Sequence, residues 1–139
     1  MKERQVKILV QRQDSRILSV PCEKEETYHD WEIPQGVVQE GETDEDAVER
    51  ILKTKTGCQT QAIVFLFEDE QDGMKTICYD VTWNWKDYQR KKRRGEDVPK
   101  IEWQKPEVLT QGPDGDFNFK MFNFMGIDFT LAVDDVMAI

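Results

Sequence analysis

Histidine and cysteine are scarce in this sequence, and each shortage excludes a class of chemistry. The 139 residues contain one histidine, His29, and three cysteines, Cys22, Cys58 and Cys78, none of them in a C-x-x-C spacing. A multi-histidine metal site is therefore excluded, and a nucleophilic triad would depend on His29 alone. Three cysteines at these spacings favour neither a disulfide framework nor a zinc cluster.

Long apolar runs are absent as well. The longest, Ala62–Phe67, contains six residues, whereas a membrane-spanning helix needs roughly 20. The first ten residues, MKERQVKILV, have neither the apolar stretch nor the small-residue cleavage site of a signal peptide. We therefore expect a cytoplasmic protein without a membrane partner.

Charge and hydrophobic content together predict one folded domain over residues 1–139. The chain carries 28 Asp plus Glu against 19 Lys plus Arg, a net charge of −9, and 38% of its residues are hydrophobic. That proportion is enough to fill one core at this length, which argues against disorder.

One segment, Arg90–Arg94, carries the opposite charge and reads RKKRR. Such a run is typical of a solvated loop, and a phosphate or nucleic-acid contact is the alternative. The neighbouring Trp83, Trp85 and Trp103 alternate with polar residues, which favours core positions over base-stacking platforms. We do not expect nucleic acid as a partner, and the role of the run stays open.

Strand patterns occur in two groups. Val6–Val10 and Arg16–Val20 are rich in β-forming residues and are joined by a short polar stretch, so we predict that they pair as a hairpin. Ala62–Glu68 is a third strand, and Asp72-Gly73 is a hairpin signal before Lys75–Trp85, whose alternation predicts one buried face. A short strand over Ile101–Trp103 follows a polar, irregular loop over Tyr88–Lys100.

Helix signals lie between and after these strands. Thr43, three acidic residues and a final Gly57 enclose a helix over Thr43–Lys55, with Lys53 and Lys55 in its last turn. Residues Phe129–Met137 have apolar side chains at helical spacing, which predicts a C-terminal helix covering the core.

The loop and helix together, WEIPQGVVQEGETDEDAVERILKTKTG, resemble the Nudix hydrolase signature. In that signature Gly, five residues, Glu and seven residues precede Arg-Glu-aliphatic-x-Glu-Glu-x-Gly-aliphatic. The residues at matching positions are Gly36, Glu42, Arg50, Leu52, Gly57 and Cys58, with Trp31 and Pro34 similar to the family's approach to the box and Gln35 where glycine is commoner. The resemblance implies an α/β fold: a Nudix-type α/β/α sandwich with a mixed β-sheet, a loop-helix-loop box and a C-terminal helix.

The sequence departs from this signature at its three metal-binding glutamates, where it has Ile51, Thr54 and Lys55. At about 100° per residue these positions share one arc of the helix, where three carboxylates can surround Mg²⁺. Ile51 has no lone pair, Thr54 is a weak neutral ligand, and Lys55 repels a cation. Nearby helix acids do not replace them, because Glu45, Asp46 and Glu49 face away and Asp44 lies roughly 10 Å along the axis.

Two interpretations of the substituted helix face stay open. In the first, Ile51 is buried, Lys55 extends along the surface at the helix end, and hydrolysis is lost. In the second, Lys55 replaces the metal as a point charge for a phosphate. By the resemblance, Glu42 and Arg50 are the catalytic matches, with Glu42 reaching a metal or holding Arg50, and Gly36, Trp31 and Lys55 are candidate ligand-binding residues.

The sequence therefore supports two hypotheses of function. The first is a Nudix-fold module that binds a small nucleotide or phosphate ester, or a protein partner, with no metal cofactor and without normal Mg²⁺-dependent pyrophosphate hydrolysis. The alternative is an active Nudix hydrolase of a nucleoside diphosphate linked to another group, using Mg²⁺ or Mn²⁺ held by Glu102 or by the acidic loop Glu68–Glu70. Neither the ligand nor the oligomeric state follows from the sequence.

Overall fold

The structure, a computed structural model, describes residues 3–22, 31–71, 73–111 and 114–126. His29, Asp72 and the predicted helix over 129–137 lie outside these residues. Within them, no helix is both long and apolar enough to cross a membrane. The elements in chain order are β1 (Arg4–Leu9), β2 (Ile17–Pro21), β3 (Trp31–Glu32), β4 (Gln35–Val37), α1 (Asp44–Thr56), β5 (Thr60–Gln71), β6 (Met74–Trp83), α2 (Trp85–Arg93), β7 (Glu102–Gln104), α3 (Pro106–Leu109) and α4 (Gly115–Met125).

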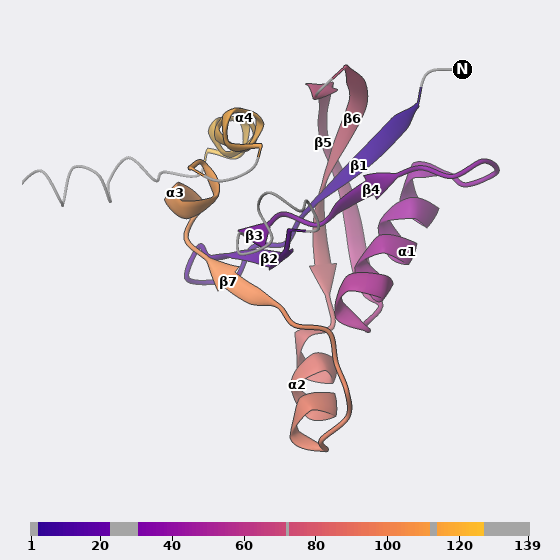
Figure 1. Ribbon diagram of the computed structural model, residues 1–139, viewed down its shortest axis with the longest axis vertical. Helices are drawn as coiled ribbons and strands as arrows, with labels where there is room; N and C mark the ends of the chain where they lie inside the picture. The colour runs from indigo at the N-terminus through magenta and orange to yellow at the C-terminus, as the bar shows by residue number, and fades with distance from the viewer. Residues whose placement is uncertain (1–2, 23–30, 72, 112–113, 127–139) are drawn as a thin grey trace, which may run out of the picture.

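The strands form a larger and a smaller sheet. The larger has the order β4-β1-β6-β5, and the smaller has the order β3-β2-β7. The larger sheet is mixed, because β1 runs parallel to β6 while its other pairs are antiparallel. Helix α1 lies on one side of this sheet and α4 on the other (Figure 1). The predicted arrangement of a mixed sheet between helices is confirmed.

The predicted hairpin of the first two strands is confirmed only at its turn. The Arg12 amide donates to the Arg16 carbonyl at 2.8 Å, and Gln11 and Ile17 form one isolated antiparallel bridge. Beyond this point the strands separate into different sheets, so the predicted pairing of the two strands was wrong. A local pattern of β-forming residues could not reveal that β1 has a partner more than 70 residues away.

The hairpin of β5 and β6 is confirmed, but the prediction of one buried face on the second strand was wrong. Residues Thr76, Ile77, Cys78 and Tyr79 are all buried. Ile77 and Tyr79 belong to the core cluster beneath α1, whereas Cys78 belongs to a second cluster beneath α4. Both faces of β6 are therefore covered, one by α1 and the other by α4 (Figure 1).

Helix α1 has the predicted ends. The Thr43 hydroxyl accepts from the Asp46 amide at 3.1 Å, and the Asp46 carboxylate accepts from the Thr43 amide at 3.2 Å. Such a capping box satisfies amides that the first helical turn leaves without partners. Gly57 ends the helix in the left-handed conformation with φ +77°, which glycine adopts without strain.

Helix α2 replaces part of the irregular loop predicted over Tyr88–Lys100, so that prediction was wrong. The Asn84 side chain accepts from the Asp87 amide at 3.0 Å and so caps the helix start. Asp87 also pairs with Arg90 and Lys91 one turn later. Cations suit the negative end of a helix dipole, and most of the basic run therefore forms the last turn of α2.

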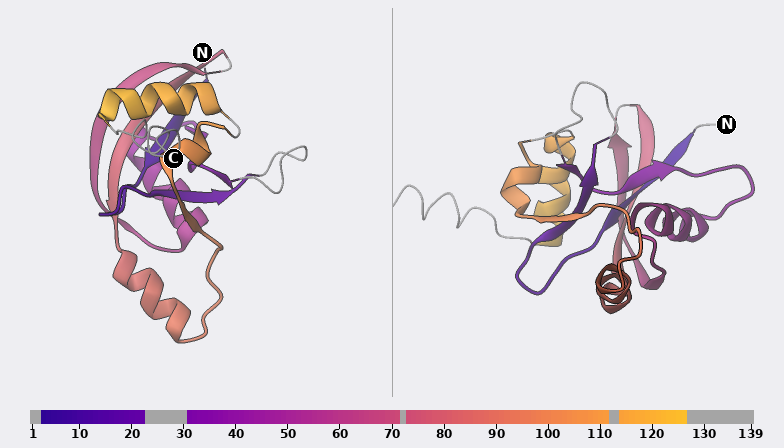
Figure 2. Two further views of the ribbon diagram at one scale, coloured as in Figure 1. Left: turned by 90° about the vertical axis from the view of Figure 1, so that its left-hand side faces the viewer. Right: turned by 60° about the horizontal axis from the view of Figure 1, so that its bottom comes forward.

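The basic run also contacts α1. The Lys91 ammonium donates to the Gly57 carbonyl at 2.9 Å, at the point where α1 ends. Trp83 is buried, and Trp85 and Trp103 pack against the same core cluster, as the alternating pattern predicted. Figure 2 shows that α2 projects at the end of the molecule opposite α4.

Two neighbouring lysines of α2 should differ in their contribution to stability. We expect Lys91→Ala to lower the free energy of unfolding by about 1 kcal/mol, because it removes a hydrogen bond and leaves the Gly57 carbonyl without this donor. The exposed Lys92 is the matched control, and Lys92→Ala should change stability by less than about 0.5 kcal/mol. Urea unfolding of both variants measures the difference, and equal effects would contradict this role of Lys91.

Candidate functional site

The candidate site begins where β4 leaves the larger sheet and turns into α1. Gly36 lies on β4 directly against the helix: a side-chain β-carbon built there would lie only 2.7 Å from Ile51 Cδ1. Gly41, in the turn that follows, has φ +84°, and a β-carbon built there would meet nothing within 4 Å. The two glycines are therefore needed for different reasons, Gly36 for close approach and Gly41 for backbone conformation.

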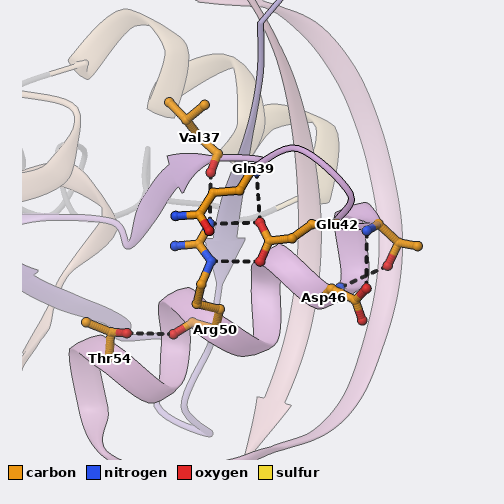
Figure 3. A network of polar contacts seen from close by, with 7 residues as sticks. Val37, Gln39, Glu42, Asp46, Arg50 and Thr54 are labelled. Atoms are coloured by element: carbon orange, nitrogen blue, oxygen red, sulfur yellow. Dashed lines mark hydrogen bonds and ion pairs between the residues drawn. The ribbon is translucent and has the colours of Figure 1, made fainter.

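An ion pair between Glu42 and Arg50 connects this loop to the helix (Figure 3). Arg50 Nε lies 2.8 Å from Glu42 Oε2, and Arg50 Nη2 lies 3.0 Å from Glu42 Oε1. The same Nη2 also donates to the Val37 carbonyl at 2.9 Å. Glu42 Oε1 accepts a further hydrogen bond of 2.8 Å from the backbone N–H of Gln39. Of the two roles expected for Glu42, the structure shows the one in which it holds Arg50.

These bonds also determine the charge state of Glu42. The Arg50 guanidinium, followed by the Gln39 amide, lowers the pKa of the Glu42 carboxyl below its ordinary value of 4.5. In return, the carboxylate raises the pKa of Arg50. Glu42 is therefore ionised at neutral pH and suited to hold a guanidinium, and it is not poised as a general acid.

The three positions that carry metal-binding glutamates in the signature offer no carboxylate here. Ile51 is only 4% exposed and packs in the core cluster with Ala47, Val48 and Leu52. The Thr54 hydroxyl donates to the Arg50 carbonyl of its own helix at 2.8 Å. Lys55, half-buried at the end of α1, brings a positive charge. Since Mg²⁺ prefers carboxylate and other hard oxygen ligands, these side chains do not fit a divalent cation.

The acids considered as substitute ligands do not form a cluster. Glu68, Asp69 and Glu70 lie on β5, not in a loop as expected, and Glu68 and Asp69 pair with Lys75 and Lys120. Glu102 is exposed on β7. Among the residues that the structure describes, no group of three His, Cys, Asp or Glu side chains is arranged to hold a metal ion.

The predicted site residues belong to different parts of the fold. Gly36, Glu42 and Arg50 come together where β4 meets α1, and Lys55 lies farther along the helix. Trp31 lies instead on β3 in the smaller sheet, where the Lys100 ammonium sits 5.6 Å from its ring centre. The structure thus groups three of the five predicted residues and places Trp31 elsewhere.

A second polar group, on the opposite face of the larger sheet, was missed from the sequence. Lys7 is 1% exposed, and its ammonium lies 4.8 Å from the centre of the Phe117 ring. Gln35 is paired with Lys7 across the strands and donates to Asp114 at 3.2 Å. The available signal was a lysine between Val6 and Ile8 in a strand, because a buried lysine is rare and often functional.

Cys58 and Cys78 are not reactive thiolates. Burial raises the pKa of Cys58 to about 11 and that of Cys78 to about 12. Both are therefore protonated at neutral pH, and the thiolate is the nucleophilic form. Cysteine chemistry at these two residues is excluded.

One family model matches most of the chain. The NUDIX domain model matches residues 1–124, and a search of curated proteins finds no match. Among solved structures, a NUDIX family hydrolase from Clostridium perfringens has a TM-score of 0.63 at 12% identity, covering 91% of this chain and 98% of its own.

Two further structures are similar at low identity. The MutT protein of Bacillus halodurans has a TM-score of 0.57 at 15% identity, covering 84% of this chain and 78% of its own. The ORF135 protein of E. coli has a TM-score of 0.53 at 19% identity, covering 88% of this chain and 92% of its own. At these identities the likeness establishes the shared fold.

The ion pair at the loop should give stability a specific dependence on pH. Because the pKa of Glu42 is lowered in the folded protein, its contribution is complete above pH 4.5 and is lost as the pH falls below that value. Glu42→Gln should therefore lower the melting temperature at pH 7, and the difference from the parent should shrink in acid.

The matched control for this measurement is Glu40→Gln, which neutralises an exposed acid in the same loop. We expect it to leave the melting temperature nearly unchanged at both pH values. A difference between Glu42→Gln and the parent that stays constant from pH 7 to pH 3 would show that the ionised pair does not stabilise the fold.

Proposed function

The chain belongs to the NUDIX domain family, and from that premise we propose that it binds a small nucleotide or phosphate ester without hydrolysing it by the metal-dependent route. Hydrolysis in this family generally uses Mg²⁺ or Mn²⁺. A metal cluster offsets the charge that develops on a pyrophosphate, which is worth several kcal/mol in the transition state. A site without that cluster lacks this stabilisation.

The observation that carries this proposal is the environment of Ile51. Its side chain packs directly on the Gly36 backbone, where a β-carbon would lie only 2.7 Å from Ile51 Cδ1. The position is thus used for packing, while the surrounding scaffold of Gly36, Glu42 and Arg50 is retained. The metal-binding glutamates are lost while the loop is kept. This combination favours a site that still binds a small molecule.

The remaining charges suit a phosphate better than a cation. Lys55 is half-buried at the end of α1, on the arc that holds metals in the signature. An ammonium there provides a point charge with three donors for phosphate oxygens. The proposed partner is therefore a small phosphate-containing molecule, and nucleic acid is not proposed.

The first test is turnover. Purified protein with Mg²⁺ or Mn²⁺ should release no appreciable phosphate or nucleoside monophosphate from ADP-ribose, diadenosine polyphosphates, NADH or nucleoside triphosphates, because the described residues form no carboxylate cluster for the metal. Product release is measured by chromatography. Metal-dependent turnover at about 1 per second or faster would support the alternative of an active hydrolase with ligands from outside the usual positions.

The second test is binding, measured by calorimetry with the same compounds and without added metal. For a compound that binds, Lys55→Gln should raise the Kd about tenfold, which corresponds to about 1.4 kcal/mol and is typical of one charged hydrogen bond. Lys53→Gln is the matched control, since Lys53 carries the same charge on another face of α1. Equal effects of the two substitutions would contradict a direct contact by Lys55.

A further inference from the structure

The outer edge of the larger sheet is apolar and exposed. Strand β5 is the last strand of this sheet, and β6 is its pairing partner among the described residues. Residues 60–67 read TQAIVFLF and carry no charge. Val64 is 57% exposed and Phe65 is 56% exposed. Folded proteins usually protect such an edge with charged residues, proline or a covering element.

The apolar surface continues from β5 onto α4. The rings of Phe67 on β5 and Phe124 on α4 lie 4.8 Å apart between centroids, and Phe124 is 58% exposed. Phe65 contacts Tyr79 on the other face of the sheet, which α1 covers, so the edge is apolar on both faces. We call the edge formed by Val64, Phe65, Phe67 and Phe124 the β5 edge surface. Exposed apolar surfaces on otherwise polar proteins mark interaction sites, and this chain has a net charge of −9.

We propose that the β5 edge surface binds a second copy of this chain, with the two β5 strands antiparallel across a two-fold axis. The two larger sheets then form one continuous sheet, and the unpaired edges satisfy each other's amides and carbonyls. A two-fold contact uses the same surface on both copies, so that it must be complementary to itself.

The charge distribution along β5 meets this requirement in one orientation. The acids Glu68, Asp69 and Glu70 all lie at one end of the strand, and the other end is neutral. In an antiparallel pair centred on Val64, Glu68 lies opposite the partner's Thr60 and Phe65 lies opposite the partner's Ile63. A parallel pair would place each acid beside its own counterpart, and like charges across strands are destabilising.

Two bulges limit the paired segment. The register with β6 shifts between Thr60 and Ala62 and again between Phe65 and Phe67. The residues from 62 to 65 are regular between these shifts and include the two most exposed apolar side chains of the strand. In a pair centred on Val64, residues 63–65 of the two copies lie opposite one another within this regular stretch, and the geometry supports a short ladder over these three residues.

The test measures the mass of the full chain by light scattering on a sizing column across the micromolar range. The parent should have twice the 16.4 kDa mass of one chain. Val64→Lys should raise the dimer dissociation constant at least about tenfold, because pairing would bury an uncompensated charge. The matched control is Val108→Lys on α3, where the parent side chain is 46% exposed outside this surface, and it should leave the dimer intact.

A second variant and a second measurement keep the outcome clear if the lysine variant folds poorly. Val64→Thr keeps a β-branched side chain and should weaken the dimer less than lysine does. In the parent, hydrogen exchange of the amides of residues 62–65 should slow as the protein concentration rises.

A parent that stays at the mass of one chain throughout this range would overturn the proposal. So would a monomeric parent whose melting temperature falls on Val64→Lys, because the strand would then be covered within its own chain. Equal weakening of the dimer by Val64→Lys and Val108→Lys would place the contact elsewhere. None of these outcomes bears on nucleotide binding, so the two proposals stand or fall separately.

Discussion

Arg50 lies in the middle of α1, and its side chain bonds Glu42 in the preceding loop and the Val37 carbonyl at the end of β4. These bonds hold the loop against the helix. The packing of Ile51 against Gly36 and the capping box at Thr43 also attach the turn after β4 to α1. Burial of Ala47, Val48, Ile51 and Leu52 determines the rotation of α1 about its own axis, and the ion pair holds the loop against the helix in that orientation. The position of the loop in the candidate site depends on this ion pair.

The central strand β6 explains why chemistry at the site can change while the fold is kept. Its two faces belong to separate core clusters, one beneath α1 and one beneath α4. An apolar residue such as Ile51 simply extends the first cluster. On the other face, Lys7, Gln35 and Asp114 introduce polar groups without interrupting the apolar packing beneath α1. A polar group and an apolar cluster thus occupy opposite sides of one sheet.

Residues that act through their sequence neighbours were predictable, and those that act through distant partners were not. Helix α1 was predicted with its ends because Thr43, Asp46 and Gly57 are all local signals. Helix α2 was missed because Gly95, Pro99 and the polar, basic composition indicated a loop. The one local helix signal, the Asn84 cap, was not considered. The spacing identified Glu42 and Arg50 as a matched pair, yet it could not distinguish a carboxylate that reaches a metal from one that holds a guanidinium. That distinction needed the 2.8 Å contact.

The parallel pairing of β1 with β6 has a consequence for the order in which this chain folds. Arg4 is paired with Lys75, so 71 residues separate them along the chain. Closing so large a loop costs chain entropy before the contact returns any energy, and topologies rich in distant contacts fold slowly. The hairpin of β5 and β6 and the helix α1 can form early from local contacts. During synthesis, β1 can pair with β4 early, but its other edge stays unpaired until β6 has been made.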